Sequence, residues 1–223
     1  MFDAPLRRAC APATDGMARL LHRHSVRAAQ ATAVGFALGL GAAASAAVGW
    51  WWPALGLWLA SRVVDGIDGA IARIERATAR GGFLDLMADF TVYAAFVAGI
   101  AVQVPSARLA AVALLCTYYV SGAAFLAWSA ATAEQQADRG GRGGLALDDN
   151  RSLRFVGGLA EGAETVAVYC LICLLPHRAA LILWAFAAMV AVTAVQRVAF
   201  AAGDLRPPTG EHRGGGGRPA DGT

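Results

Sequence analysis

Long apolar segments dominate this sequence and restrict it to folds that a membrane can hold. Of its 223 residues, 57% are hydrophobic and 16% are charged, and the mean hydropathy is +0.49. Residues 28–49 form an uninterrupted uncharged run, and a run of about eighteen or more apolar residues is long enough to cross a bilayer as a helix. Such a composition is too apolar for a soluble domain of this length. We therefore expect an all-α integral membrane protein.

Six apolar segments predict six transmembrane helices, which together make one membrane domain over residues 28–200. The second segment is about twenty-one residues long and would form roughly 32 Å of helix, enough to cross the hydrocarbon core. In the first segment, Gly35 and Gly39 have a spacing that lets helices pack closely. Three tryptophans within residues 50–53 predict a tight loop at the membrane interface. The six segments are residues 28–49, 54–74, 83–104, 107–129, 155–175 and 179–200.

Polar segments flank and interrupt the membrane domain. Residues 1–27 form a basic leader, for which the sequence leaves open a short interfacial helix after Pro12 or a disordered segment. Residues 130–154 are polar and rich in glycine, which predicts a loop or an extended interfacial segment. Residues 201–223 contain repeated glycine and a Pro-Pro pair, which predicts a disordered tail.

The distribution of arginine predicts the orientation in the membrane. The chain contains no lysine, so all nineteen basic residues are arginine. If the N-terminus lies in the cytoplasm, every arginine except Arg62, Arg108 and Arg178 lies on the cytoplasmic side. These cytoplasmic arginines belong to the leader, the hairpin between the second and third helices, the long loop and the C-terminal end. Because cytoplasmic segments carry the excess of positive charge, we expect a multi-pass protein of the cell's inner membrane with both termini in the cytoplasm.

Four aspartates lie at the facing ends of the second and third predicted helices. Asp65 and Asp68 are three residues apart, and Asp85 and Asp89 are four apart, so each pair projects from one face of its helix. A short polar hairpin over residues 74–80 turns the two faces toward each other. Four converging carboxylates repel one another unless they are protonated or bind cations, and hard oxygen ligands suit Mg²⁺ or Mn²⁺. The alternative is a set of solvated helix ends.

The spacing of these residues resembles the signature of the CDP-alcohol phosphatidyltransferases, D-x2-D-G-x2-A-R-x7/8-G-x3-D-x3-D. Every fixed position of the signature is present. The resemblance implies a six-helix membrane enzyme, homodimeric as in this family, that transfers a substituted phosphate from a CDP-alcohol to a hydroxyl acceptor and releases CMP. The fixed positions are Asp65, Asp68, Gly69, Ala72, Arg73, Gly81, Asp85 and Asp89.

The resemblance also implies a role for each position. Asp65, Asp68 and Asp85 would be the main ligands of two divalent ions, and Asp89 would both bind the second ion and take the proton of the acceptor hydroxyl as a base. The CDP-binding positions comprise three small residues, at which the cytidine and its phosphates approach the backbone, and one arginine, which offers a charged fork to a phosphate. These positions are Gly69, Ala72, Gly81 and Arg73.

The fifth predicted helix is expected to form a wall of the acceptor pocket, because it carries two carboxylates inside the membrane, where ionisable groups are costly and usually functional. The alternative is that they cap polar groups of a neighbouring helix or pair with nearby arginines. Arg62, within the second helix, is expected to face the aspartates or a substrate phosphate. The predicted pocket residues are Glu161, Glu164, Arg62, Arg151 and Arg154.

The acceptor is predicted to carry no phosphate. Family members that accept phosphorylated alcohols have a basic G-K-x-K-T-like segment in this region, whereas this chain is acidic there and has no lysine. We therefore expect a phospholipid-synthesising transferase at the cytoplasmic membrane surface, with CDP-diacylglycerol in the bilayer as donor and a small alcohol as acceptor. The enzymatic alternative is a phosphatidylglycerophosphate- or phosphatidylinositol-phosphate-type synthase, which uses a phosphorylated acceptor.

A third hypothesis is a cation transporter that uses the same carboxylates as an ion path. A transporter should place charges near the bilayer midplane and show inverted repeats, whereas these aspartates gather at one face. No nucleic-acid partner is expected.

Overall fold

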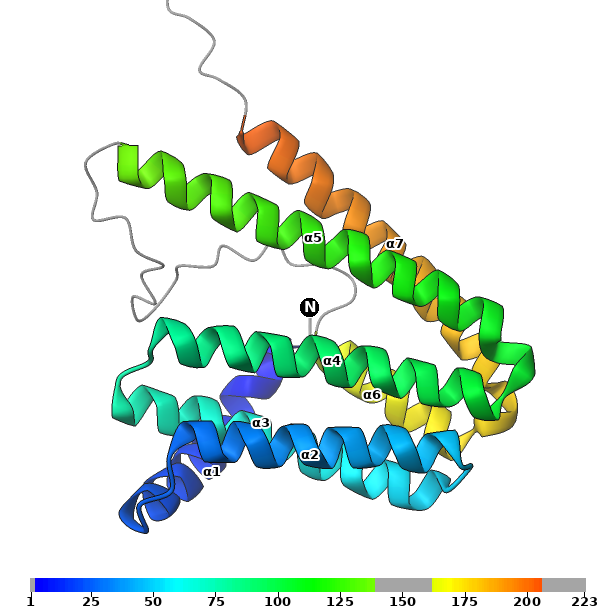
Figure 1. Cartoon of the computed structure of the whole chain (residues 1–223), viewed down its shortest axis with the longest axis horizontal. Helices are drawn as coiled ribbons and strands as arrows, with labels where there is room; N and C mark the ends of the chain where they lie inside the picture. The colour runs from blue at the N-terminus through cyan, green and yellow to red at the C-terminus, as the bar shows by residue number, and fades with distance from the viewer. Residues whose placement is uncertain (1–2, 139–161, 206–223) are drawn as a thin grey trace, which may run out of the picture.

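Seven α-helices and two short 3₁₀ helices make up residues 3–138 and 162–205, the part of the chain that the computed structural model describes. No strand occurs among these residues (Figure 1), as the apolar sequence predicts. The elements are α1 (Asp3–Arg23), α2 (Ala28–Ala47), α3 (Trp51–Glu75), α4 (Ala79–Gln103), η1 (Pro105–Ala107), α5 (Arg108–Asp138), α6 (Gly162–Leu174), η2 (Pro176–Arg178) and α7 (Ala179–Asp204).

Helices α2, α4, α5 and α7 are long and apolar enough to cross a membrane. They correspond to the first, third, fourth and sixth predicted spans. The second predicted span corresponds to α3, which is 25 residues long but less apolar, because it carries Arg62, Asp65, Asp68 and Arg73. The fifth corresponds to α6, whose 13 described residues begin at Gly162. The helices therefore support the membrane class, and the count of six spans stays a prediction.

Helices α3, α4, α5 and α7 extend beyond the bounds that the sequence predicts. Helix α4 begins earlier, at Ala79, and α7 ends later, at Asp204. Helix α3 begins at Trp51, so most of the predicted loop 50–53 forms its first turn, where Pro53 is tolerated because first-turn amides need no helical partner. Helix α5 continues to Asp138. Its last turns, residues 130–138, are rich in Ala, Glu and Gln, which favour helix, so the helix includes the start of the predicted polar loop.

Short turns reverse the chain on either side of α3. The predicted hairpin after α3 is reduced to residues 76–78, in which Arg76 has a φ of 70°. Thr78 caps α4, because its hydroxyl oxygen accepts a hydrogen bond from the amide of Gly81 at 3.1 Å. In the turn before α3, Gly49 has a φ of 80°, which glycine adopts without steric cost.

Small residues let α2 lie against both α3 and α4, the helices that it contacts most extensively. A Cβ atom at Gly39 would lie 2.5 Å from a methyl carbon of Val92, and one at Gly99 would overlap the carbonyl oxygen of Ala43. Glycine is therefore needed at both positions for the helices to approach so closely. Gly35 is buried against α3, so the predicted glycine spacing serves packing within the bundle.

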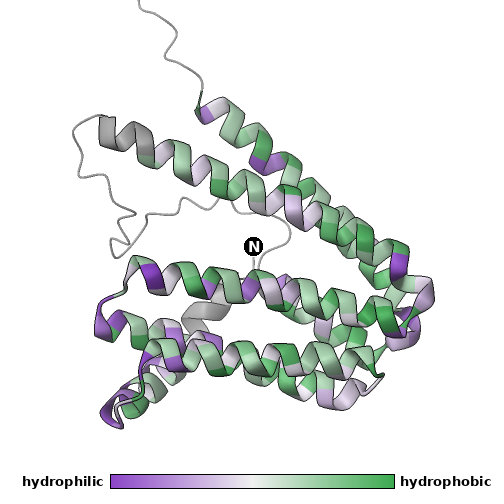
Figure 2. Ribbon diagram, in the orientation of Figure 1, coloured by the Kyte–Doolittle hydropathy of each residue, from purple (hydrophilic) through white to green (hydrophobic). Residues whose placement is uncertain are grey.

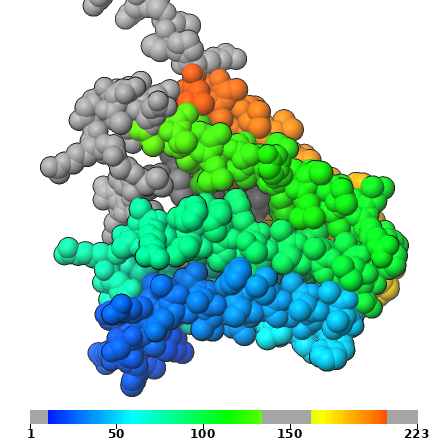
Figure 3. Space-filling model, viewed as in Figure 1, coloured from blue at the N-terminus to red at the C-terminus, as the bar shows by residue number. Residues whose placement is uncertain are grey.

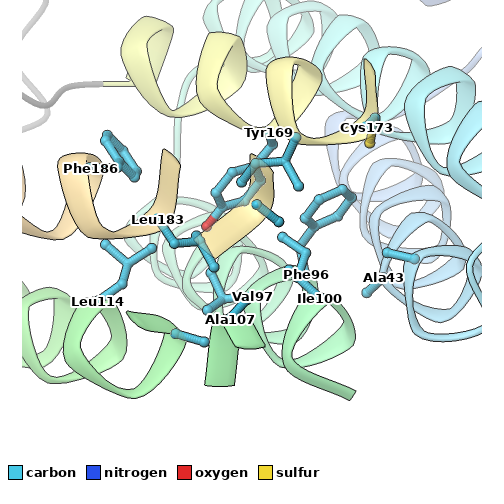
Figure 4. Close-up of a cluster of buried hydrophobic side chains, with 14 of the residues drawn as sticks. Ala43, Phe96, Val97, Ile100, Ala107, Leu114, Tyr169, Cys173, Leu183 and Phe186 are labelled. Atoms are coloured by element: carbon cyan, nitrogen blue, oxygen red, sulfur yellow. The ribbon is translucent and has the colours of Figure 1, made fainter. Parts of the chain in front are cut away.

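An aromatic cluster occupies the core where α3, α4 and α6 meet. The fully buried ring of Trp58 lies 5.0–5.8 Å from the rings of Tyr93, Phe96 and Tyr169. Phe96 and Tyr169 stack with centroids 4.8 Å apart, and Figure 4 shows both rings in the interior, with Cys173 nearby. Such pairs contribute about 0.5–1.5 kcal/mol each beyond the burial of their area. The cluster fixes α3 against α4 about two helical turns from the aspartate motif.

Helices α5 and α7 run side by side and diverge from α4 away from the η1 end (Figure 1). Near η1 the two helices are joined by an edge-to-face contact between Tyr118 and Phe186. At their far ends, the indole nitrogen of Trp128 donates to the carboxylate of Asp204 at 3.0 Å. The pair therefore forms a second layer beside the layer of α2, α3 and α4.

Apolar residues predominate along the long helices, and polar residues gather near the helix ends (Figure 2). Val102, Leu109, Leu181 and Val195 are 63–70% exposed. Large apolar side chains exposed in this way on long apolar helices are suited to contact with lipid.

Residues 3–23 of the predicted leader form helix α1, which lies at one end of the bundle (Figure 3). Ala18 is fully buried and packs with Ala70 and Ile71 of α3, whereas Met17 and Leu20 stay about half exposed. Of the two possibilities that the sequence leaves open, the structure has the helix. An exposed apolar flank on a basic helix is suited to the membrane interface.

Candidate active site

Three carboxylates meet where α3 and α4 approach each other. Asp65 and Asp68 project from the C-terminal half of α3, and Asp85 projects from the second turn of α4. One carboxylate oxygen of each lies within 4.8 Å of the others. At an effective dielectric of about 20, two unit charges at such a distance repel by roughly 3 kcal/mol. The group therefore requires a cation, a proton or a counter-charge.

The donor set fits a hard divalent cation. Asp68 is 4% exposed, and its buried Oδ2 atom has no hydrogen-bond partner among the described residues. A buried carboxylate oxygen without a partner is destabilising, and an ion would supply the missing partner. Sites made of carboxylate oxygens suit Mg²⁺ or Mn²⁺. Asp65, Asp68 and Asp85 are thus the residues that would hold such an ion.

Asp89 lies outside this group and is paired with Arg62. The Nη1 atom of Arg62 donates to Oδ1 of Asp89 at 2.7 Å and lies 3.7 Å from Oδ2 of Asp65. The sequence predicts that four carboxylates converge; the structure brings three together and places the fourth on a guanidinium group. Of the two partners expected for Arg62, the aspartates are the ones that it contacts.

The guanidinium of Arg62 is held from several directions, and its side chain is 10% exposed. Nη1 also donates to the hydroxyl of Tyr93 at 3.2 Å, and Nη2 donates to Oγ of Ser61 at 3.0 Å. The guanidinium carbon lies 4.9 Å from the ring centroid of Trp58 and 5.2 Å from that of Tyr93. Sequence reasoning missed Tyr93, although its position four residues after Asp89 places both on one face of α4.

The four predicted CDP-binding positions lie on either side of the turn between α3 and α4. Gly69, Ala72 and Arg73 belong to the last turns of α3, and Gly81 belongs to the first turn of α4. Arg73 and Gly81 are exposed, and the other two are partly exposed. Small residues therefore leave the backbone accessible beside the carboxylates.

Arg73 is paired with a residue that sequence reasoning missed. Its Nη2 atom lies 3.2 Å from Oδ1 of Asp15 in α1, and the two side chains are 53% and 44% exposed. A second contact joins α1 and α3, since Glu75 lies 3.8 Å from Nδ1 of His22. Glu75 also accepts from the amide of Ala28 in α2 at 3.3 Å. No short-range pattern links Asp15 to Arg73, because their proximity follows from the packing of α1 on α3.

The predicted acceptor pocket is described in part. Glu164 lies in the first turn of α6, and Arg62 lies on the aspartates, as given above. Glu161, Arg151 and Arg154 lie outside the described residues.

A second arginine inside the helical bundle is Arg197 of α7. Its Nη1 atom donates to Oγ of Ser121 in α5 at 2.9 Å. The next residue, Gly122, packs against the ring of Phe90 in α4, which brings this part of α5 to the level of the aspartates. The sequence groups Arg197 with the basic C-terminal end, whereas α7 continues to Asp204 and keeps Arg197 within the bundle.

Known proteins match most of the chain. The sequence profile of the CDP-alcohol phosphatidyltransferases matches residues 26–198, which include the whole aspartate motif. The inner membrane protein YnjF of Escherichia coli (strain K12) is 36% identical over 199 residues, which are 89% of this chain and 94% of the relative.

Two solved structures share the fold. Mycobacterium tuberculosis phosphatidylinositol phosphate synthase (PgsA1) with CDP-DAG bound has a TM-score of 0.65 at 22% identity, over 84% of this chain and 92% of that one. The same synthase in complex with manganese and citrate has a TM-score of 0.65 at 20% identity, over 85% and 88% of the two chains. At these identities the likeness establishes the arrangement of the helices.

Proposed function

This chain belongs to the CDP-alcohol phosphatidyltransferase family, and on that premise we propose that its donor is CDP-diacylglycerol, its acceptor a small alcohol and its nucleotide product CMP. It is an enzyme, because the family match covers residues 26–198. The single observation that carries the proposed site is the group of three carboxylates within 4.8 Å. A structure of the same fold contains CDP-DAG, which supports a lipid-linked donor here.

Asp65, Asp68 and Asp85 would hold a divalent ion, and Asp89 would contribute to the binding of a second one. When bound, such ions stabilise the negative charge that develops on the phosphate oxygens in the transition state. The buried, unpartnered oxygen of Asp68 supports this assignment.

In the proposed reaction, the acceptor oxygen attacks the lipid-side phosphorus of the donor. A new oxygen–phosphorus bond forms, the bond from that phosphorus to the bridging diphosphate oxygen breaks, and CMP leaves with the electron pair. The proton of the acceptor hydroxyl goes to Asp89, the carboxylate that lies apart from the group of three. A well-placed general base contributes about 10²–10⁴-fold to the rate.

The nucleotide would bind beside the turn between α3 and α4, where Gly69, Ala72 and Gly81 expose the backbone and Arg73 offers two donors to a phosphate. Arg73 pairs with Asp15 in the described structure, so the diphosphate would replace one anionic partner with another. The arginine distribution supports a cytoplasmic location for this end of the bundle. The acyl chains would then stay in the bilayer of the inner membrane.

The acidic start of α6 supports an acceptor without a phosphate. Glu164 lies in the first turn of α6, and a phosphorylated acceptor carries up to about two negative charges near pH 7. Like charges a few ångströms apart in a poorly solvated site cost several kcal/mol at an effective dielectric of about 20. A neutral or amino alcohol avoids this cost.

Arg197 favours the alternative, an acceptor that carries a phosphate. Its permanently charged guanidinium lies between α5 and α7, where it donates to Ser121, and a guanidinium group suits an anionic ligand. The two alternatives predict opposite preferences in one competition assay. Under the alternative, Arg197→Gln would reduce the use of phosphorylated acceptors selectively.

The decisive experiment gives the purified protein labelled CDP-diacylglycerol, Mn²⁺ or Mg²⁺ and a panel of neutral, amino and phosphorylated alcohols, and measures CMP release. We expect release that depends on the acceptor and is fastest with an alcohol that lacks a phosphate. A clear preference for glycerol phosphate or inositol phosphate would establish the alternative. No CMP release with any acceptor would refute the donor assignment. Arg108→Gln, at the opposite end of the bundle, serves as the active control.

A further inference from the structure

Arg62 and Asp89 form an ion pair of 2.7 Å beside the group of three carboxylates, and we propose that Arg62 is a positioning residue that holds Asp89 ready to accept the proton of the acceptor hydroxyl. This inference rests on the proposed role of Asp89 as the base. It adds the group that orients the base, at a position outside the eight fixed positions of the family signature.

A chain of hydrogen bonds fixes Arg62 to the backbone of α2. The fully buried Oγ of Ser61 donates to the carbonyl oxygen of Gly35 at 2.8 Å and accepts from Nη2 of Arg62 at 3.0 Å. The other terminal nitrogen of the same guanidinium, Nη1, donates to Asp89. Because the guanidinium is rigid and planar, holding Nη2 in place also determines where Nη1 lies. The orientation of Asp89 on α4 is thus set by α2 and α3.

Aromatic side chains restrict the guanidinium further. It lies close to the rings of Trp58 and Tyr93, at 4.9 Å and 5.2 Å from their centroids, and cations are attracted to aromatic rings at such distances. Tyr93 also accepts from Nη1 through its hydroxyl. The hydroxyl of Tyr169 in turn donates to the backbone carbonyl of Tyr93 at 3.1 Å. The aromatic core therefore contacts Arg62 in addition to its carboxylate partners.

The ion pair has two consequences for Asp89. It engages Oδ1, which leaves Oδ2 to accept a proton. It also keeps Asp89 out of the group of Asp65, Asp68 and Asp85, although Asp85 lies one turn earlier on the same helix. Without Arg62, we expect the Asp89 carboxylate to lose this fixed orientation, so that it accepts the proton less effectively. Turnover would then fall while affinity for the ion would not.

A direct contact between Arg62 and a substrate phosphate is the competing role. Both terminal nitrogens of Arg62 already donate to protein groups, and the side chain is 10% exposed. The two roles differ in kinetics, because losing a phosphate contact raises KM, whereas misplacing a base lowers kcat.

The test compares Arg62→Gln and Arg62→Lys with the wild type, each also in an Asp89→Asn background. For Arg62→Gln we expect kcat to fall about 100-fold, the lower end of the contribution of a general base, with KM for the donor and the Mn²⁺ activation constant within about threefold. Arg62→Lys should be intermediate, since lysine keeps the charge but loses the fork. In the Asp89→Asn background, adding Arg62→Gln should lower kcat by a further factor of less than about three, because the two residues act as one unit. Arg108→Gln is the matched control and should keep wild-type kcat.

Three results would overturn the inference: wild-type kcat in Arg62→Gln, a loss that appears mainly in KM, or an undiminished further loss in the Asp89→Asn background. Thermal unfolding in detergent checks that each variant folds. If Arg62→Gln does not fold, Arg62→Lys and Tyr93→Phe carry the same test, and wild-type kcat in both would overturn it. CMP release by the wild type is measured first. Its absence refutes the proposed function, whereas an active wild type with unaffected Arg62 variants refutes this inference alone.

Discussion

The guanidinium of Arg73 and the carboxylate of Asp15 lie 3.2 Å apart, which joins the signature helix α3 to the N-terminal helix α1. Arg73 is the charged position among the proposed CDP-binding residues, so Asp15 pairs with the guanidinium that the diphosphate of the donor would bind. Because both side chains are about half exposed, solvent screens the pair and limits its contribution to about 1 kcal/mol.

Arg73→Gln is expected to raise KM for the donor about tenfold or more, because charged hydrogen bonds to a phosphate contribute about 1.5–3 kcal/mol. Asp15→Asn should change KM by no more than about fivefold in either direction, since the exposed pair contributes at most about 1 kcal/mol. Steady-state CMP release measures both. Arg19→Gln, in the same helix as Asp15, controls for a general effect of substitutions in α1. Equal effects of the two test variants would contradict a phosphate contact by Arg73.

Removal of divalent ions should abolish activity, and Mn²⁺ or Mg²⁺ should restore it, because three carboxylates within 4.8 Å need a counter-charge. Mn²⁺ should also raise the unfolding temperature of the wild type, since a ligand that binds the folded state stabilises it. Asp68→Asn should lose most of this thermal shift. Undiminished CMP release in excess chelator would rule out the metal site.

Asp89→Asn should lower kcat by about 10²–10⁴-fold, the usual contribution of a general base, and leave the Kd for the CDP-alcohol close to that of the wild type. The reason is that Asp89 lies outside the group of three and pairs with Arg62. Single-turnover CMP release and equilibrium donor binding separate the two quantities. Asp85→Asn is the contrasting variant, in which binding should weaken as well. Wild-type turnover in Asp89→Asn would exclude it as the base.

Gly99→Ala should destabilise the fold by about 1–3 kcal/mol, because its Cβ atom would overlap the carbonyl oxygen of Ala43 in α2. Gly56→Ala is the matched control: nothing lies within 4 Å of the added atom, and alanine favours helix by about 1 kcal/mol over glycine. Unfolding in detergent measures both. Equal stability of the two variants would show that α2 and α4 are packed less closely than described.

Both termini and the segment after α5 are expected to face the cytoplasm. A membrane-impermeant thiol reagent should label Ala146→Cys and Thr209→Cys from the cytoplasmic side, and Ser106→Cys from the other side. The background for these variants lacks Cys10, Cys116, Cys170 and Cys173. Labelling of Ala146→Cys from outside would reverse the orientation inferred from the arginines.

The sequence predicts the meeting of Asp65, Asp68 and Asp85 because it depends on two local facts, the helical period and a short hairpin. The pairing of Asp89 with Arg62 depends on side-chain rotamers and on the angle between α3 and α4, which no spacing specifies. The contact between Asp15 and Arg73 joins helices far apart along the chain. The sequence predicts that the fourth helix ends at residue 129, whereas α5 ends at Asp138. The difference arises because the glycine-rich part of the segment 130–154 makes the whole segment resemble a loop.

Because the turn of residues 76–78 is short, segments that are close together in the sequence form the site. Closing so short a loop costs little conformational entropy. Helices α2, α3 and α4 together supply the four aspartates of the motif, Arg62 and the groups that hold it, apart from Tyr169. Once α4 has been synthesised, nearly all of the proposed catalytic residues are therefore present, while α5, α6 and α7 are still to be made. On the proposed assignments, the order of synthesis would separate the groups for the chemistry from α6, the proposed wall of the acceptor pocket.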